Sequence, residues 1–189
     1  MKNNEYIRLG GVLLIITSVV ALLLGFLNSK TDYVIAEAEA RKKQDSMSSV
    51  MEGAASFVPY DGQLELTGPI TELNLAYNDA GDLMGYCFTL VTRGYGGDIT
   101  IMAGINTEDT VTGVEIVSHS ETAGLGANAN TPAWLSQFSG KTQGLSVVKN
   151  LPQGNQIQAV TSATITSKAV TGAIDEALVF AQTLAEKED

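Results

Sequence analysis

Few residues in this sequence could bind a metal or form a disulfide. Cys87 is the single cysteine and His119 the single histidine among 189 residues. One cysteine can neither form an internal disulfide nor hold an iron–sulfur cluster, and one histidine cannot supply a His-rich metal or haem site. The sequence therefore predicts no metal site, and any redox chemistry would require an organic cofactor. Cys87 lies in a predicted strand and is expected in the core.

Basic residues are also scarce. The chain has 11 Lys and Arg against 21 Asp and Glu, a formal net charge of −10. Glu5, Lys2 and Arg8 are the charged residues before residue 28, which leaves 20 acidic and 9 basic residues beyond it, a balance of 9 − 20 = −11. An acidic domain of this kind is not expected to bind nucleic acid or an anionic lipid surface.

One long hydrophobic run, Leu9 to Leu27, contains no charged residue. As a helix it would extend about 28 Å, close to the roughly 30 Å hydrocarbon thickness of a bilayer. A cleaved signal peptide is the competing interpretation, but its apolar region is normally shorter and ends in a small-residue cleavage site. This run ends Gly-Phe-Leu-Asn-Ser-Lys, so we expect a retained single-pass transmembrane anchor.

The predicted anchor separates a short N-terminal tail from the stalk and the folded domain. Lys2 and Arg8 before the span and Lys30 after it give a charge asymmetry that favours a cytoplasmic N-terminus only weakly. Beyond the span, residues 32–55 have the composition of a helix, with Gly53 near its end. The predicted parts are a cytoplasmic tail (1–8), a transmembrane helix (9–27), a helical stalk (28–56) and one folded domain (57–189).

The folded domain is predicted to be α+β with a largely antiparallel sheet. Alternating or apolar segments separated by short turns predict hairpin-connected strands at 72–77, 83–92, 99–105 and 111–117. Two further strands are expected at 145–148 and 157–160, and a short helix at 132–138. An apolar stripe predicts a terminal helix from about Ser167 to Glu186 that packs on the sheet.

The stretch Gln158-Ala-Val-Thr-Ser-Ala-Thr-Ile-Thr-Ser167 precedes this terminal helix. Its hydroxyls and backbone N–H groups would lie at the positive end of the helix dipole, an arrangement that favours a phosphate group. Alternatively, Thr166 or Ser167 serves simply as the N-cap of the helix. Two glycine-rich loops stand out besides, Gly94-Tyr-Gly-Gly97 and His119-Ser-Glu-Thr-Ala-Gly-Leu-Gly126, although each could be no more than a turn.

In order and content, these three loops resemble the FMN-binding domain of the Rnf complex G subunits and of the related C subunits of sodium-translocating NADH:quinone reductases. That family has a Gly-Tyr-Gly-Gly turn, a His-x-Glu-Thr-Pro-Gly-Leu-Gly loop and a Ser/Thr-Gly-Ala-Thr flavinylation motif. Ala123 stands at the proline position, Gln158 where the motif often has aspartate, and Ser162 where it often has glycine. Since serine disfavours positive φ, we expect a turn at Ser162 that a Cβ tolerates.

The resemblance implies that the last threonine of the motif, Thr164, carries FMN through a phosphoester bond. The hydroxyls of Thr161, Ser162 and Thr166, with Lys168 as the cation, would surround the phosphate. The second loop would contact the polar edge of the isoalloxazine, with Leu125 and Trp134 covering its faces; ordinary core packing is an equal alternative for Trp134. His119 is a candidate proton relay, or is simply solvated or hydrogen-bonded. The implied cofactor-binding residues are Thr161, Ser162, Ala163, Thr164, Thr166, Lys168, Glu121, Thr122, Gly124, Leu125, Gly126 and Trp134, with no catalytic residue and no metal ligand.

The implied function is electron transfer by covalently bound FMN within a membrane-anchored, ion-translocating ferredoxin:NAD⁺ oxidoreductase, with the flavin domain outside the cytoplasm. The implied partners are the other subunits of that complex, a flavin transferase and membrane lipid. Alternatives are a C-type subunit of a quinone reductase or a free-standing flavinylated carrier. A non-catalytic, membrane-anchored ligand-binding module is an alternative of another class.

Overall fold

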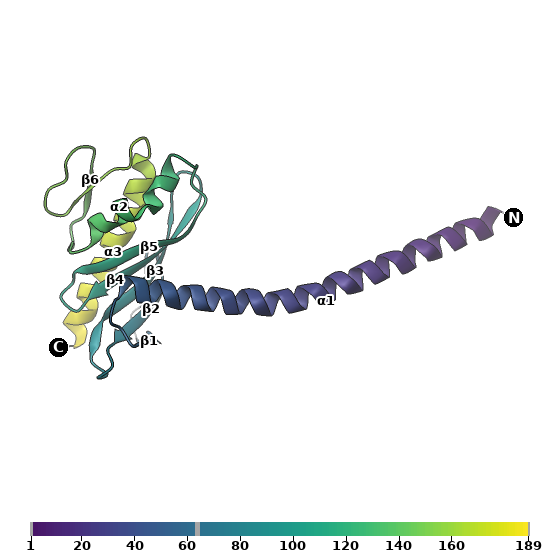
Figure 1. The fold of residues 1–189 in the computed structure, drawn as a ribbon, viewed down its shortest axis with the longest axis horizontal. Coiled ribbons are helices and arrows are strands. Elements are labelled where there is room, and N and C mark those ends of the chain that lie inside the picture. The colour runs from purple at the N-terminus through teal and green to yellow at the C-terminus, as the bar shows by residue number, and fades with distance from the viewer. Residues whose placement is uncertain (1, 63–64, 189) are drawn as a thin grey trace. The chain divides into compact units, whose positions relative to one another are not determined.

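The computed structural model describes residues 2–62 and 65–188. The chain divides into two compact units, Met1–Gln44 and Asp45–Asp189. Helix α1 (Lys2–Val50) runs through the described part of the first unit and ends inside the second (Figure 1). The stalk helix predicted over 32–55 is therefore the later part of one uninterrupted helix, and it stops at Val50, before Gly53. Gly53 instead takes φ +87° in the turn that follows.

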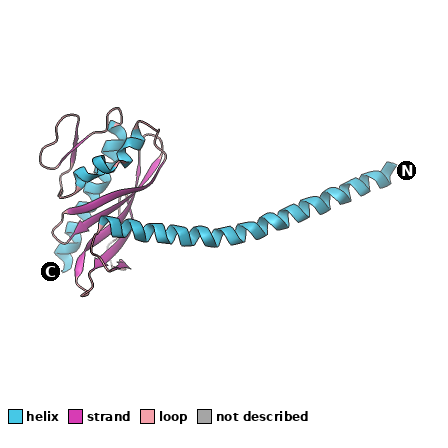
Figure 2. Cartoon of the chain, viewed as in Figure 1, coloured by secondary structure: helices cyan, strands magenta, loops and turns pink. Residues whose placement is uncertain are grey.

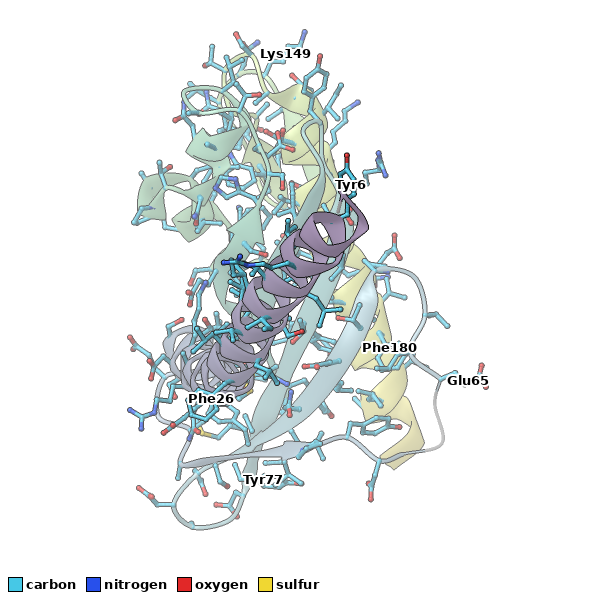
Figure 3. All side chains as sticks on the ribbon, turned by 90° about the vertical axis from the view of Figure 1, so that its right-hand side faces the viewer. Tyr6, Phe26, Glu65, Tyr77, Lys149 and Phe180 are labelled. Atoms are coloured by element: carbon cyan, nitrogen blue, oxygen red, sulfur yellow. The ribbon has the colours of Figure 1, made fainter. Side chains whose placement is uncertain are left out.

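In the first unit, α1 exposes apolar side chains. Val12, Leu13, Leu14, Ile15 and Ile16 are each at least half exposed, at five consecutive positions, and Figure 3 shows the labelled side chains of Tyr6 and Phe26 on the same helix. Among the described residues, no helix has an apolar stretch long enough to cross a membrane. The side chains of Leu9 and Leu27, which bound the predicted span, lie outside the described residues, as do most of those in the predicted tail 1–8.

The second unit is built on a five-stranded antiparallel sheet whose strands follow one another in chain order. The four strands that the alternation predicted are confirmed, each extended by one or two residues. Their hairpin connections are confirmed as well. The edge strand at 56–59 was missed, because its four residues show no clear alternation. The strands are β1 (Ser56–Pro59), β2 (Ile70–Tyr77), β3 (Leu83–Arg93), β4 (Asp98–Asn106) and β5 (Val111–His119).

After the sheet, the chain forms short elements and a long helix. Two 3₁₀ turns, η1 (Gly126–Asn130) and η2 (Ser136–Phe138), flank the short helix α2 (Pro132–Leu135). Strands β6 (Ser146–Val148) and β7 (Gln156–Gln158) pair in parallel. Helix α3 (Thr164–Glu188) then lies against β3 and β4 (Figure 2).

The start of α3 corrects the predicted start at Ser167. The backbone N–H of Ser167 already donates to Ala163 O at 3.0 Å, so Ala163 is the N-cap and Thr164 the first helical residue. Neither Thr166 nor Ser167 caps the helix. The Thr166 hydroxyl donates to Glu121, and Ser167 Oγ accepts the N–H of Val160 at 2.9 Å.

The two faces of the sheet are covered by different helices. Because side chains alternate along a strand, Phe88 and Ile101 face α3, whereas Cys87 and Met102 face the opposite side. There they pack with Met47, Val50 and Met51 at the end of α1. Burial raises the pKa of the Cys87 thiol to about 12, so this thiol stays neutral in the core, as its strand position predicted.

Hydrogen bonds and two glycines fix the end of α1 on the sheet. Ser46 and Ser49 donate to the Glu115 carboxylate at 3.1 and 2.6 Å, and the Thr112 hydroxyl donates to Val50 O. A Cβ at Gly104 would overlap the Val50 carbonyl oxygen, and one at Gly113 would lie 2.9 Å from Val50 Cα. The helix backbone therefore approaches the strands more closely than side chains would allow.

Replacing Gly104 with alanine should destabilise the second unit, because its Cβ would meet backbone atoms of Val50 that cannot move without displacing the helix end. We expect a loss of about 1–3 kcal/mol in the free energy of unfolding, measured on the full chain by chemical denaturation. The matched control is Gly172→Ala in the middle of α3, where a Cβ meets nothing within 4 Å. That variant should gain about 0.5–1 kcal/mol, because alanine favours a helix. An unchanged stability of Gly104→Ala would contradict the close approach.

Candidate functional site

A cavity of about 430 Å³ lies where three loops meet. The loops are the Gly94–Gly97 turn between β3 and β4, the segment after β5, and the stretch that opens α3. The cavity wall is part polar, with hydroxyls of threonine and serine, and part apolar, with Leu125 and Ile165. Its lining residues are Tyr95, Glu121, Thr122, Leu125, Gly126, Ser162, Ala163, Thr164, Ile165 and Thr166.

The Glu121 carboxylate joins the three loops. Its Oε1 accepts the backbone N–H of Gly96 at 2.9 Å, and its Oε2 accepts the hydroxyl of Thr166 at 2.7 Å. The side chain is 9% exposed, so both bonds are largely shielded from water. Charge-assisted hydrogen bonds to a shielded carboxylate are stronger than neutral ones. Glu121 therefore holds the first and third loops against its own.

The glycines of the loops leave room for this carboxylate. A Cβ at Gly94 or at Gly126 would overlap the Glu121 side chain, and one at Gly96 would overlap Ser120 O. Gly124 differs, because it is exposed, has φ +77°, and does not line the cavity. Gly94, Gly96 and Gly126 therefore allow the loops to pack closely and do not supply a positive φ for a turn.

His119 orients the start of the second loop. Its Nδ1 accepts the backbone N–H of Glu121 at 3.2 Å, which assigns the ring proton to Nε2 in the neutral form. His119 is half-buried and does not line the cavity. The structure thus gives it a hydrogen-bonded place at the end of β5, and its role as a proton relay stays a hypothesis.

The first turn of α3 presents polar groups to the cavity. Ala163, at the N-cap, has no side-chain oxygen to accept the N–H groups of Ile165 and Thr166, which lack intrahelical acceptors at this end. No acidic residue lies in this turn. The helix dipole adds partial positive charge there. The arrangement suits an anionic group beside Thr164.

Ser162, just before the N-cap, has a left-handed backbone conformation. It has φ +62°, one of two positive-φ values among the described non-glycine residues. Serine disfavours positive φ, and we expected a turn here that a Cβ tolerates; the left-handed region is such a conformation, at a cost of about 1–2 kcal/mol. The turn therefore keeps the conformation that a glycine would take.

Some of the predicted site residues line the cavity and others do not. Glu121, Thr122, Leu125, Gly126 and the segment 162–166 line the cavity. Thr161 lines a neighbouring cavity instead, and Lys168 lines another with Arg93 and Glu176. Trp134 is buried away from all three, where its indole N–H donates to Gln158 O at 2.7 Å and its ring packs edge-on against Phe138.

Two residues that line the cavity were not predicted. Tyr95 is 75% exposed and Ile165 is 57% exposed. Tyr95 is the aromatic residue of the first loop, and Ile165 directly follows Thr164. An aromatic or apolar residue at each of these loop positions, beside polar or glycine neighbours, is typical of a binding surface.

Comparison with known proteins agrees with this geometry. The model of the FMN-binding domain family matches residues 94–179, which include all three loops. The G subunit of the Na⁺-translocating ferredoxin:NAD⁺ oxidoreductase complex of Acetobacterium woodii is 34% identical over 95% of this chain and 93% of its own. The G subunit of the ion-translocating oxidoreductase complex of Methanosarcina acetivorans is 31% identical over 94% and 95%. This chain belongs to the Rnf G-subunit family.

Solved structures show that the fold of this G-subunit family member is shared more widely. The C subunit of the Na⁺-translocating NADH-quinone reductase of Parabacteroides distasonis aligns with a TM-score of 0.52 at 21% identity, covering 66% of this chain and 74% of that chain. NqrC of Shewanella oneidensis aligns with a TM-score of 0.51 at 20% identity, covering 68% and 67%. These similarities establish the α+β fold.

Replacing Glu121 with glutamine should weaken the junction of the three loops. The amide oxygen can still accept the Gly96 N–H, but the NH₂ group can bond Thr166 only if that hydroxyl turns from donor to acceptor, and both bonds lose the charge of the carboxylate. We expect a loss of about 1–3 kcal/mol in the free energy of unfolding of the full chain, measured by chemical denaturation. Glu52→Gln, at an exposed position, is the control and should change stability little. Equal stability of the two variants would argue against the role of Glu121.

Proposed function

We propose that this chain is the FMN-carrying electron-transfer subunit of an ion-translocating ferredoxin:NAD⁺ oxidoreductase complex. One observation carries the proposal: the three loops that the FMN-binding family model covers converge on a single cavity with Thr164 in its wall. Relatives that match nearly the whole chain bear the names of G subunits of such complexes. The C-type subunit of a quinone reductase remains the main alternative, and at 21% identity the resemblance to it extends to the fold alone.

The residues of the cavity suit FMN. Its volume of about 430 Å³ lies within the roughly 300–1,000 Å³ usual for small-molecule sites. Leu125 and Ile165 provide apolar surface for a planar ring, and Tyr95 an aromatic one. Bound FMN supplies reversible electron acceptance and donation. The chain holds and orients it, while NAD⁺ and ferredoxin react at other subunits.

We further propose that the FMN is attached covalently at Thr164. Thr164 is half-buried and lines the cavity at the first turn of α3. Thr166 is 1% exposed and its hydroxyl already donates to Glu121. Thr161 does not line this cavity. Of the three threonines in the motif, Thr164 is therefore the one whose place suits a phosphoester to a ring in the cavity.

Attachment requires an activated flavin, and a flavin dinucleotide is the donor class that balances the reaction. The Thr164 hydroxyl oxygen forms a bond to the FMN phosphorus, the pyrophosphate bond breaks, and a nucleoside monophosphate leaves. The hydroxyl proton passes to a base of the flavin transferase that catalyses the step. The first-turn N–H groups of α3 would stabilise the phosphoryl oxygens.

The N-terminal part of α1 is proposed as a membrane anchor with the flavin domain outside the cytoplasm. Five consecutive positions of a helix cover all of its sides, so the exposed apolar run at 12–16 leaves no polar side for water. A helix that is apolar all round requires an apolar environment, which lipid or another membrane protein of the complex provides. Covalent attachment would keep the flavin from diffusing away outside the cell.

Replacing Thr164 with valine should abolish flavin attachment, because valine is isosteric but has no hydroxyl. The full chain is expressed together with a flavin transferase, and intact-mass analysis should show the flavin mass on wild-type protein and its absence from Thr164→Val. Thr161→Val is the matched control and should keep the flavin. Flavin retained on Thr164→Val would place the attachment elsewhere. A wild-type chain without flavin, in the presence of an active transferase, would favour a non-catalytic binding module.

The proposed topology predicts how protease digests the protein in intact protoplasts. Added protease should degrade the flavin domain, while a tag placed before Lys2 stays protected inside. A mature chain that begins after Leu27 would show instead that the segment is a cleaved signal peptide. Cleavage of the tag with survival of the domain would reverse the orientation.

A further inference from the structure

A second cavity of about 300 Å³ adjoins the first. The two cavities share Ser162 and Thr164 in their walls. The second is more polar, with hydroxyl and ammonium groups in its lining, whereas the first carries the larger apolar side chains. The second cavity is lined by Lys149, Ala159, Val160, Thr161, Ser162 and Thr164.

The pairing of β6 with β7 brings Lys149 to this cavity. The two strands run in parallel, with Val148 opposite Gln158, and the backbone N–H of Ala159 donates to Val148 O at 2.7 Å. Lys149 directly follows β6, and the motif segment directly follows β7. The same end of a parallel pair therefore holds the lysine beside Thr161, Ser162 and Thr164. Figure 3 labels Lys149 at the end of the domain where α3 begins.

The other lysine near the motif is placed differently. Lys168, which the sequence suggested as the phosphate cation, lines a cavity with Arg93 and Glu176. That cavity shares no residue with the one beside Thr164. Lys149 and Lys168 can therefore be compared directly, since both are exposed lysines and they line different cavities.

We propose that Lys149 binds the phosphate of the attached FMN, so that the phosphodiester lies in the second cavity and the isoalloxazine in the first. This inference rests on the proposed attachment at Thr164, whose place in both walls lets one residue join the two parts of the cofactor. A phosphodiester keeps one negative charge, and the Lys149 ammonium offers three donors to its oxygens. The hydroxyls of Thr161 and Ser162 and the first turn of α3 complete the set of donors.

The test compares Lys149→Gln, Lys149→Arg and Lys168→Gln in the full chain, purified in detergent. Phosphorus NMR of the flavinylated protein should show a shifted phosphodiester resonance in Lys149→Gln and a resonance near the wild-type position in the other two variants. The initial rate of flavin incorporation by the transferase should fall about two- to fivefold in Lys149→Gln, the range expected for loss of one exposed ion pair. Lys149→Arg should restore the rate, because it restores the charge.

The outcomes separate this inference from the proposed function. A wild-type chain that carries no flavin contradicts the proposed function itself. A flavinylated wild type, with resonance and rate unchanged in Lys149→Gln, overturns the role of Lys149 and leaves the attachment intact. A shifted resonance in Lys168→Gln, with Lys149→Gln unchanged, assigns the phosphate to Lys168 and overturns the proposal as well. Loss of incorporation in Lys149→Arg as severe as in Lys149→Gln, with normal unfolding, overturns the role of charge.

Discussion

The hydrogen bonds of the Glu121 carboxylate are the interaction on which the candidate site depends. Gly96 and Thr166 are 70 residues apart along the chain, and each donates to a different oxygen of this one side chain. A buried carboxylate requires such partners, because an unpaired charge out of water is costly. A Cβ at Gly94 or Gly126 would overlap the carboxylate, and one at Gly96 would overlap the neighbouring Ser120 O. The hydrogen bonds of Glu121 therefore depend on the lack of side chains at these glycines.

Hydrogen bonds within the protein already engage two of the hydroxyls in the motif. The Thr166 hydroxyl donates to Glu121. The Ser167 hydroxyl accepts the N–H of Val160 and donates to Ala163 O. Thr164 lies between the two cavities at a helix start whose N-cap is an alanine. A capping serine or threonine there would itself accept the free N–H groups of the first turn. The alanine leaves those groups without a side-chain acceptor, which is what the phosphate proposed beside Thr164 requires.

The opposite face of the sheet packs against the end of α1. Gly104 and Gly113 allow the end of α1 to lie close to β4 and β5, and Glu115 accepts two serine hydroxyls from its last turns. Three methionines and Cys87 fill the contact. Flexible methionine side chains fill irregular gaps well. The helix end is therefore part of the folded unit, although the sequence pattern assigns it to a separate stalk.

Four of the antiparallel strands, the terminal amphipathic helix and the three loops could be predicted from the sequence, because they depend on periodicity, turn residues and motifs that are local in the chain. It did not determine where α3 begins, since Thr166 and Ser167 look like caps until Glu121 and Val160 are seen to occupy them. It suggested Lys168 and not Lys149 as the cation near the motif, because only the parallel register of β6 and β7 brings Lys149 beside Thr164. Nor could it decide between core and cofactor for Trp134, whose N–H is satisfied by Gln158 O. Each of these depends on contacts between segments distant in sequence, which only the tertiary structure specifies.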